Sequence, residues 1–318
     1  MAKAGSRKVV IAALLGNAAI AATKFAAAAV TGSSAMLSEG VHSLVDTCNE
    51  LLLLYGMKRA ERPPDAAHPF GYGREVYFWS FIVALLVFAL GAGVSFYEGI
   101  AHLREPEPME RPRVAYLVLG ASLLFEGASW WVAMRAFRAG KGALGWFEAF
   151  RASKDASTFT VLFEDTAALL GLLIALAGVA AAHATGDPRF DGYASLGIAL
   201  VLAAASMLLA RETKGLLLGE AAHPRVRDAI LRIAAADPGV RRANGVLTVQ
   251  LGPNSVAAAL SAEFEDALTT PQIEACVDRI EAEVRRSHPD VVSLFVKPQT
   301  ARTWRARAAR LRAADPPP

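Results

Sequence analysis

Six long apolar blocks fill the first two thirds of the sequence, and they constrain the fold more than any other feature. A helix needs about 20 consecutive apolar residues to cross the hydrocarbon core of a bilayer. The composition agrees with several such crossings, because 54% of the residues are hydrophobic and only 20% are charged. We therefore predict a multi-pass α-helical membrane protein with six transmembrane helices, over residues 9–30, 34–57, 76–100, 114–137, 159–182 and 192–210.

Lys and Arg between the blocks predict the orientation. Loops on the cytoplasmic side of a membrane protein carry an excess of these residues. Here the N-terminus and the connections after the second, fourth and sixth blocks are basic, whereas the connection after the first block, residues 31–33, has no charge. We expect an integral protein of a bacterial inner membrane with both termini in the cytoplasm.

The pattern changes after Glu220 to amphipathic segments separated by Pro, Gly and Asp. Apolar periodicity and turn residues predict a helix, two strands, a second helix that starts at Thr269 or Thr270, and a last strand. This order predicts a small cytoplasmic ferredoxin-like α/β domain whose sheet edges are suited to pairing with a second copy. The first helix and the strands are placed at residues 224–236, 245–251, 256–264 and 291–296.

The domain boundaries follow from these changes in pattern. Residues 1–218 are assigned to the transmembrane domain and residues 219–299 to the α/β dimerisation domain. Residues 300–318 form a basic tail with five Arg, which we expect to be disordered or to seek lipid headgroups. The net charge of +3 is modest and indicates no nucleic-acid partner.

The segment SEGVHSLVDTCNE, residues 38–50, places Glu39, His42 and Asp46 inside the second apolar block. Ionisable side chains at membrane depth normally face a bundle interior or a water-filled path. His42 and Asp46 are four residues apart and share one face of a helix. A neutral imidazole and a carboxylate on a rigid helix are half of a tetrahedral site for a divalent metal ion. Cys48 beside them is interpreted as a small packing residue.

The other half of the site is expected in the fifth block, where FTVLFEDTAALLG contains Glu164 and Asp165. Adjacent residues lie about 100° apart on a helix, so one of the two carboxylates is expected to face the site. Alternatively the pair caps the helix end, because residues 153–158 before it are polar. Three polar residues of other blocks either line a path or form an interhelical ion pair and hydrogen bond, and the Lys can alternatively snorkel to the interface: Asn17, Lys24 and Glu126.

Together these features resemble the cation diffusion facilitator family, over nearly the whole chain. The matching segments are TGSSAMLSEG, HSLVD, DAAHPFGYGREVYFW, GAGVSFYEGI, VLFEDTAALLG and LLGEA. The resemblance implies a homodimeric exporter of divalent metals, usually zinc, driven by proton exchange. HSLVDTCNE and VLFEDTAALLG look closer to the branch that includes the ninth animal zinc transporter, a mitochondrial zinc carrier.

The resemblance also implies the ligands. His42 and Asp46 match the pair on the family's second helix, and Asp165 matches the acid of a His-x-x-x-Asp pair on its fifth helix. Val161 stands where the His of that pair would be. In the similar branch an acidic residue beside the Asp replaces that His, which makes Glu164 the candidate fourth ligand.

Further sites of the family can be compared in the same way. Asp65 and His68 match an Asp-x-x-His zinc element between the second and third helices, but Tyr72 stands at its usual third ligand, so we expect an incomplete site. The strands of the α/β domain lack histidines and His288 is expected to cap a helix end, which predicts a metal-free domain that dimerises by shape. Glu39 would lie on an exit path.

The function implied is a proton-coupled antiporter that exports Zn²⁺ from the cytoplasm by alternating access. Its substrates would be the metal ion and protons, with the bilayer and a second copy as partners and no cofactor. A Mn²⁺ or Fe²⁺ exporter is one alternative, because a carboxylate-rich site is harder than a site with two imidazoles. A non-transporting, metal-sensing membrane scaffold is another. An enzyme is not expected, since no HExxH pattern occurs.

Overall fold

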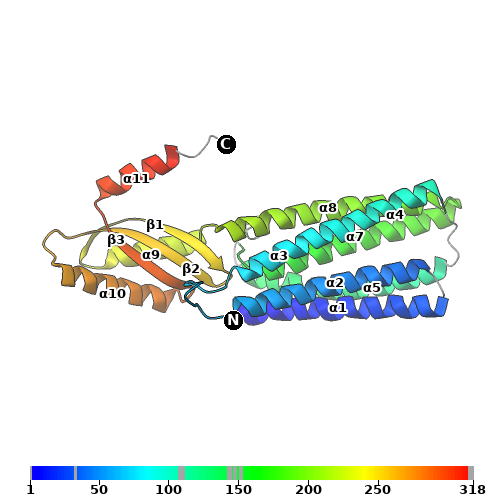
Figure 1. Cartoon of the computed structure of the whole chain (residues 1–318), viewed down its shortest axis with the longest axis horizontal. Helices are drawn as coiled ribbons and strands as arrows, with labels where there is room; N and C mark the ends of the chain where they lie inside the picture. The colour runs from blue at the N-terminus through cyan, green and yellow to red at the C-terminus, as the bar shows by residue number, and fades with distance from the viewer. Residues whose placement is uncertain are drawn as a thin grey trace. The chain divides into compact units, whose positions relative to one another are not determined.

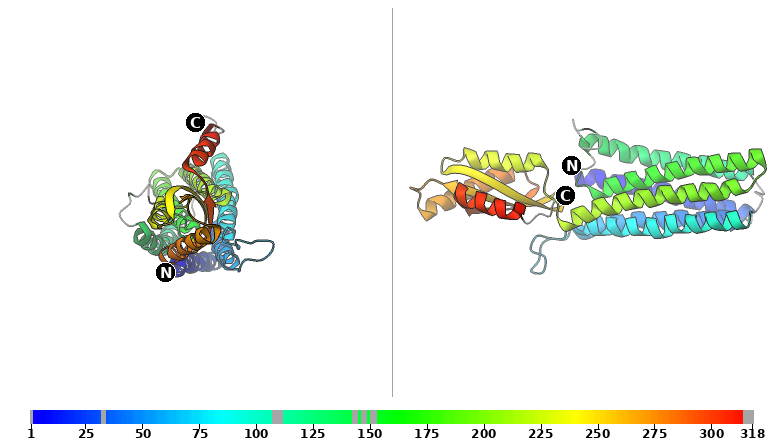
Figure 2. Two further views of the ribbon diagram at one scale, coloured as in Figure 1. Left: turned by 90° about the vertical axis from the view of Figure 1, so that its left-hand side faces the viewer. Right: turned by 90° about the horizontal axis from the view of Figure 1, so that it is seen from above.

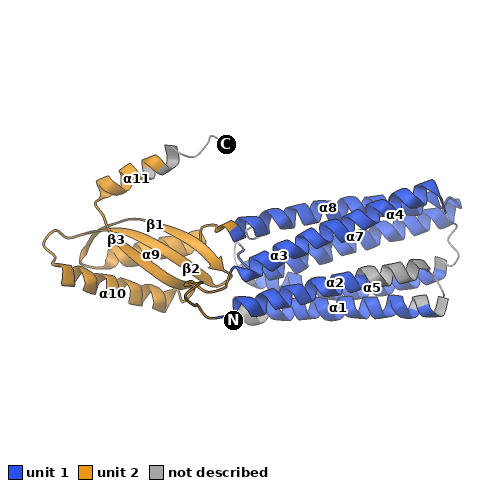
Figure 3. Ribbon diagram, viewed as in Figure 1, with its two compact units in different colours: residues 1–62, 74–217 blue, residues 63–73, 218–318 orange. Residues whose placement is uncertain are grey.

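The computed structural model divides the chain into two compact units (Figures 1 and 3). The helical unit comprises residues 1–62 and 74–217, and the sheet unit comprises residues 63–73 and 218–318. The structure describes residues 2–31, 34–106, 112–141, 145, 149 and 153–313. Within helices, the side chains at these positions are outside the description: 2–5, 27, 28, 30, 31, 34–42, 112, 140, 308 and 311–313.

Long helices run side by side through the helical unit (Figures 1 and 2). They are α1 (Ala2–Thr31), α2 (Ser34–Ala60), α3 (Glu75–Leu86) with η1 (Val87–Ala92) and α4 (Gly93–Arg104), α5 (Pro112–Lys141), α7 (Ala156–Thr185) and α8 (Arg189–Leu218). Among the described residues, five helical segments are long and apolar enough to cross a membrane: Ser6–Ala26, Glu75–Arg104, Arg113–Ala139, Ala156–Thr185 and Arg189–Leu218. The chain is therefore an integral multi-pass membrane protein. Six crossings stay a prediction, because α2 is not among the five.

Two apolar cores hold the helices together. One core joins α1, α2, α3, α5 and α7 and includes Leu53, Val83 and Val161, and the other joins α3, α7 and α8. Small residues let α7 and α8 approach closely, since a Cβ atom built on Gly178 would lie 2.5 Å from the Cβ of Ala194. The apolar blocks thus form a packed bundle around the polar residues of α2, α5 and α7.

The third membrane helix contains the π-helical turn η1, which the sequence analysis did not predict. The backbone N–H of Gly93 donates to the carbonyl of Phe88, five residues earlier. Single π-helical turns inside α-helices are rare and often occur at functional sites. The residues on both sides of η1 are apolar, so their periodicity gave no signal for it.

The sheet unit contains α9 (Pro224–Ala236), β1 (Val240–Gly252), β2 (Ser255–Phe264), α10 (Thr270–Ser287) and β3 (Val291–Pro298). The central strand β2 pairs antiparallel with β1 and parallel with β3. Ile230 of α9 and Ile280 of α10 pack with Leu260 in one core, so both helices cover the same sheet face. The predicted order of helices and strands is confirmed. So is the helix start, where Thr269 and Gln272 form a capping box.

Two segments differ from the prediction. Residues 63–73 belong to the sheet unit and not to the transmembrane domain over 1–218. The tail was expected to be disordered or to seek lipid headgroups, and its residues 301–313 form helix α11 (Ala301–Ala313) instead of a disordered segment. The indole of Trp304 packs on Gly245 of β1, and this contact gives the otherwise strongly basic helix an apolar anchor.

Candidate metal site in the helical unit

Five acidic residues gather in the interior of the helical unit. Asp46 and Glu50 come from α2, Glu126 from α5, and Glu164 and Asp165 from α7, and their carboxylates act on one another electrostatically. Glu50 is 1% exposed, Asp165 2% and Glu126 8%. Burying several like charges is costly unless positive charge compensates them. The cluster is therefore a candidate cation site.

The start of α7 explains why two of the acids lie in the interior. Asp155 is the N-cap, whose carboxylate accepts hydrogen bonds from the backbone N–H of Thr158 (3.3 Å) and from the Ser6 hydroxyl (2.5 Å). Glu164 and Asp165 follow more than two turns inside the helix. The alternative that this pair caps the helix end is therefore wrong.

Helix α5 holds Asp165 in position. The hydroxyl of Ser129 donates to Oδ2 of Asp165 at 2.7 Å, and Nε1 of Trp130 donates to the hydroxyl of Thr166 at 3.0 Å. These bonds join neighbouring residues of α5 to neighbouring residues of α7. They set the rotation of α7 about its axis and thereby the direction of the Asp165 carboxylate.

Two carboxylate oxygens of the cluster lack a hydrogen bond. Oε2 of Glu50 and Oε2 of Glu164 are buried and accept no hydrogen bond from the described residues. Glu164 is half-buried as a residue, but this oxygen is inaccessible to solvent. Most buried polar atoms in proteins have a partner, so an orphaned carboxylate oxygen points to a ligand that binds there.

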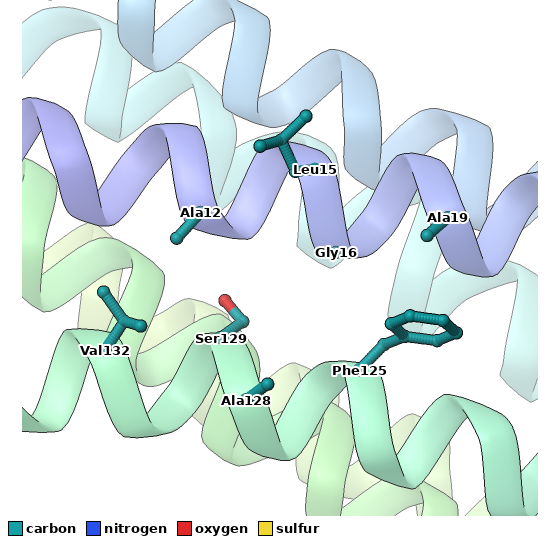
Figure 4. A pocket seen from close by; sticks show the side chains of 8 residues that line it. All are labelled: Ala12, Leu15, Gly16, Ala19, Phe125, Ala128, Ser129 and Val132. Atoms are coloured by element: carbon teal, nitrogen blue, oxygen red, sulfur yellow. The ribbon is translucent and has the colours of Figure 1, made fainter.

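A cavity of about 290 Å³ lies between α1 and α5 (Figure 4), and its lining includes Ser129, which donates a hydrogen bond to Asp165. Ser129 contributes the one polar side chain to its lining, and the neighbouring lining residues Gly16, Phe125 and Val132 are apolar. Such a lining offers no set of ligands for a cation. The cavity instead provides free space beside the hydroxyl that binds Asp165.

Lys24 of α1 is buried near the acids. Its Nζ donates to the Ser43 hydroxyl of α2 at 2.9 Å, and its charge attracts the carboxylate of Glu126. These contacts support the interhelical alternative for Lys24 and Glu126. Asn17, also on α1, is 8% exposed.

The profile of the cation efflux transmembrane domain matches residues 10–218, about two thirds of the chain. The chain belongs to the cation efflux family. The mitochondrial proton-coupled zinc antiporter SLC30A9 of Mus musculus is 36% identical over 268 residues, which are 84% of this chain and 47% of the relative. Metal tolerance protein C4 of Arabidopsis thaliana is 31% identical over 252 residues (79% and 55%). The cation-efflux pump FieF of Klebsiella pneumoniae is 27% identical over 286 residues (87% and 90%).

Family membership confirms the resemblance drawn from HSLVD and VLFEDTAALLG, including the branch of the ninth zinc transporter. It also places the chain among transporters and not among enzymes. The chain spans about half the length of the first of these curated relatives.

In this cation efflux protein, the predicted ligands come together only in part. Asp46, Glu164 and Asp165 belong to the acidic cluster. The side chains of His42 and Glu39 lie outside the described residues, and only their backbone positions in α2 are placed. The backbone of His42 is one helical turn before Asp46. Its role as a metal ligand stays a prediction.

Val161 occupies the place of the family's second imidazole. It is 0% exposed and belongs to the apolar core with Leu53 and Val83. An aliphatic side chain cannot bind a metal ion, so α7 lacks one donor at this depth. Within the described part of the chain, no three His, Cys, Asp or Glu side chains are arranged to hold a metal ion.

Glu50 is the residue that the sequence analysis missed. It ends the segment SEGVHSLVDTCNE, four residues after Asp46 and eight after His42. A continued four-residue spacing places the three sequence positions on one side of a helix. This repeat is the signal that could have identified it.

The loop residues Asp65, His68 and Tyr72 form a local network in the sheet unit. Oδ2 of Asp65 accepts a hydrogen bond from the Tyr72 hydroxyl at 2.6 Å, and Oδ1 accepts from the backbone N–H of His68 at 2.7 Å. The Tyr72 bond and then the backbone bonds hold the pKa of Asp65 below its ordinary value. Donors within the loop thus occupy both carboxylate oxygens. The expectation that Asp65 and His68 form only an incomplete metal site stays a prediction.

Histidines of the sheet unit take part in helix caps. His223 is the N-cap of α9, where its Nδ1 accepts from the backbone N–H of Arg225 at 3.1 Å. His288 is the C-cap of α10, as predicted. These capping roles fit the expectation of a metal-free domain, which stays a prediction.

Proposed function

We propose that this protein is a proton-coupled antiporter that exports a divalent metal cation from the cytoplasm by alternating access. Zn²⁺ is the first candidate for this cation. In this proposal α2 is the sixth membrane helix, and the ion is bound by His42, Asp46, Glu164 and Asp165. The observation that carries the proposal is the buried cluster of acids from α2 and α7, in which Oε2 of Glu164 has no hydrogen-bond partner among the described residues. The SLC30A9 relatives, named proton-coupled zinc antiporters, support the choice of ion.

The chemistry of the cluster suits exchange of a metal ion for protons. A divalent cation neutralises carboxylates that would otherwise repel one another, and it requires them ionised and the imidazole neutral. Protons that enter from the far side compete for the same groups and displace the ion. Ser129 keeps the Asp165 carboxylate directed into the site through this exchange.

The same proposal includes the role of the sheet unit, the orientation of the chain and the membrane that contains it. The sheet unit is a cytoplasmic ferredoxin-like domain through which two copies dimerise, and both termini lie in the cytoplasm. The relatives of SLC30A9 type are named mitochondrial, whereas the FieF pumps are bacterial. A bacterial inner membrane stays a prediction. In either membrane the ion leaves the compartment that contains the sheet unit.

A Mn²⁺ or Fe²⁺ exporter is the second candidate. Carboxylates outnumber imidazoles among the proposed ligands, and hard oxygen ligands favour these ions more than a site with two imidazoles does. Competition between Zn²⁺, Mn²⁺ and Fe²⁺ for uptake into proteoliposomes distinguishes the candidates. The preferred substrate is the ion that suppresses uptake of the other two at the lowest concentration.

Transport is tested with the full chain in proteoliposomes whose interior is more acidic than the medium. Zn²⁺ uptake is expected for the wild type and is expected to be lost in Asp46→Asn and Asp165→Asn. Asp187→Asn, which makes the same change at an exposed position between α7 and α8, serves as the control and should transport normally. Normal Zn²⁺ uptake by Asp165→Asn would contradict the assignment of Asp165 as a ligand of the transported ion. Metal binding without any uptake by the wild type would favour the non-transporting scaffold.

A further inference from the structure

Glu50 is a buried carboxylate that the proposed function does not yet use. The residue is 1% exposed, and its Oε2 has no hydrogen-bond partner among the described residues. The described charged groups that act on it are the other four acids of the cluster, with Glu164 first in strength. A structural role in packing would be served better by an uncharged side chain, because an unpaired buried carboxylate destabilises a fold.

The helix geometry directs Glu50 toward the site. Side chains separated by four residues are rotated by roughly 40°, so Glu50 lies about 40° from Asp46 and about 80° from His42. That spread is narrower than the apolar stripe of an ordinary amphipathic helix, about 100°. Glu50 and Asp46 therefore share one side of α2, and the backbone position of His42 is on the same side.

Glu50 of α2 and Glu164 of α7 lie near each other in the bundle, since Glu164 is the first of the charged groups that act on Glu50. The two helices run antiparallel in the bundle (Figure 1). Cα–Cβ bonds tilt toward the N-terminus of a helix. Glu50 therefore leans back toward Asp46, and Glu164 leans back toward Val161. We expect the two long side chains to converge near the level of Val161, where α7 has no side chain that can bind a metal ion.

We infer that Glu50 is a ligand of the transported cation and supplies, from α2, the donor that α7 lacks at Val161. The inference rests on the proposed function, because it assigns a further ligand to the same site. Leu53, about one turn beyond Glu50, and Val161 belong to one apolar core. In this inference Asp46, Glu50, Glu164 and Asp165 bind the cation together with His42. The carboxylates must move closer together to do so, because the described side chains are not arranged to hold a metal ion as they stand.

Cobalt binding to the detergent-purified full chain tests the inference. Co²⁺ bound by a thiolate gives a charge-transfer band in the near ultraviolet. Glu50→Cys should gain this band relative to the wild type, which contains both native cysteines, Cys48 and Cys276. Glu126→Cys places a thiol at another buried acid of the cluster and should not gain it. Absence of the band in Glu50→Cys that still binds Co²⁺ overturns the inference.

Affinity for Zn²⁺ gives a second, independent measurement. Glu50→Gln keeps the size of the side chain, and it should weaken Zn²⁺ binding at least ~10-fold, since even partners of metal ligands commonly contribute 10–100-fold. Glu126→Gln removes the same charge without removing a ligand and should have a clearly smaller effect. Equal losses in both variants would mean that general charge, and not coordination by Glu50, determines the affinity.

The two proposals fail in different ways. Without Zn²⁺ uptake by the wild type, the proposed function itself is wrong. If the wild type transports, Asp165→Asn does not, and Glu50→Gln binds and transports like the wild type, only the role of Glu50 is wrong.

Discussion

Ser129→Ala tests how α5 contributes to the proposed metal site. Ser129 is 4% exposed and donates to Oδ2 of Asp165, itself 2% exposed, at 2.7 Å. The substitution removes this hydrogen bond and leaves the rest of α5 unchanged. The carboxylate then rotates more freely, and metal binding must restrict it again. We expect weaker Zn²⁺ binding by the purified protein.

The size of the effect follows from the strength of the bond. A hydrogen bond to a charged group contributes about 1.5–3 kcal/mol. With about 1.4 kcal/mol for each tenfold change, its complete loss on binding would raise the Kd about 10- to 150-fold. Because the bond already exists without metal, only part of this energy affects binding, and we expect about a tenfold increase.

Isothermal titration of Zn²⁺ into the wild type and the variant measures the change. Ser80→Ala is the matched control, because Ser80 of α3 is 0% exposed and its hydroxyl has no hydrogen-bond partner among the described residues. That variant should bind as the wild type does. If Ser129→Ala also binds with unchanged affinity while Asp165→Asn loses binding, Ser129 does not orient the ligand and this reasoning is refuted.

Three further predictions concern the sheet unit and are checked by amide hydrogen exchange of the full chain in detergent. Leu260→Ala empties a position that is 0% exposed in the core, so it should destabilise the unit by about 2–5 kcal/mol and speed exchange in β2; unchanged exchange would exclude a tightly packed core there. Burial alone would raise the pKa of Asp237, but hydrogen bonds from Arg279 and from the backbone N–H of Gly239 hold it below its ordinary value. Asp237 therefore stabilises the folded state above about pH 4, the usual unfolded pKa, and this contribution falls as the pH drops through the lower folded pKa. Asp237→Asn should accelerate exchange at neutral pH much more than in acid, and an equal effect at both would contradict this. Gly245→Val puts a Cβ atom 2.4 Å from the α11 indole, so it should release α11 and abolish protection over 301–313 while β2 stays protected.

Sequence patterns were sufficient to predict a helix or strand where the capping residues and apolar periodicity lie within that one element. The capping residues Thr269 and Gln272 and the apolar positions of α10 predicted that helix, because both signals repeat within one amphipathic element. Length and hydropathy also predicted five helices that the structure shows to be long and apolar enough to cross a membrane, whereas the crossing by α2 stays a prediction. The Arg-rich tail was misread, because its helix depends on packing of Trp304 against a distant strand.

Side-chain partners across helices could not be predicted in the same way. Nearly continuous apolar blocks have little periodicity, so the sequence does not show how far each helix is rotated about its axis. The pair Glu164 and Asp165 therefore allowed either a cap or a site. The cap Asp155 and the Ser129 bond, which involve three different helices, exclude a cap formed by this pair, and the metal site stays a proposal.

The sequence by itself determined that this chain crosses a membrane and contains a small α/β unit, and it predicted His42, Asp46, Glu164 and Asp165 as ligands of a metal ion. Only the tertiary structure decided that Glu50 is buried among the same acids and that Val161 is part of an apolar core. The physical reason is that hydropathy and spacing act along one helix, whereas burial and electrostatic repulsion between carboxylates depend on the depth and rotation of helices that meet only in the folded bundle.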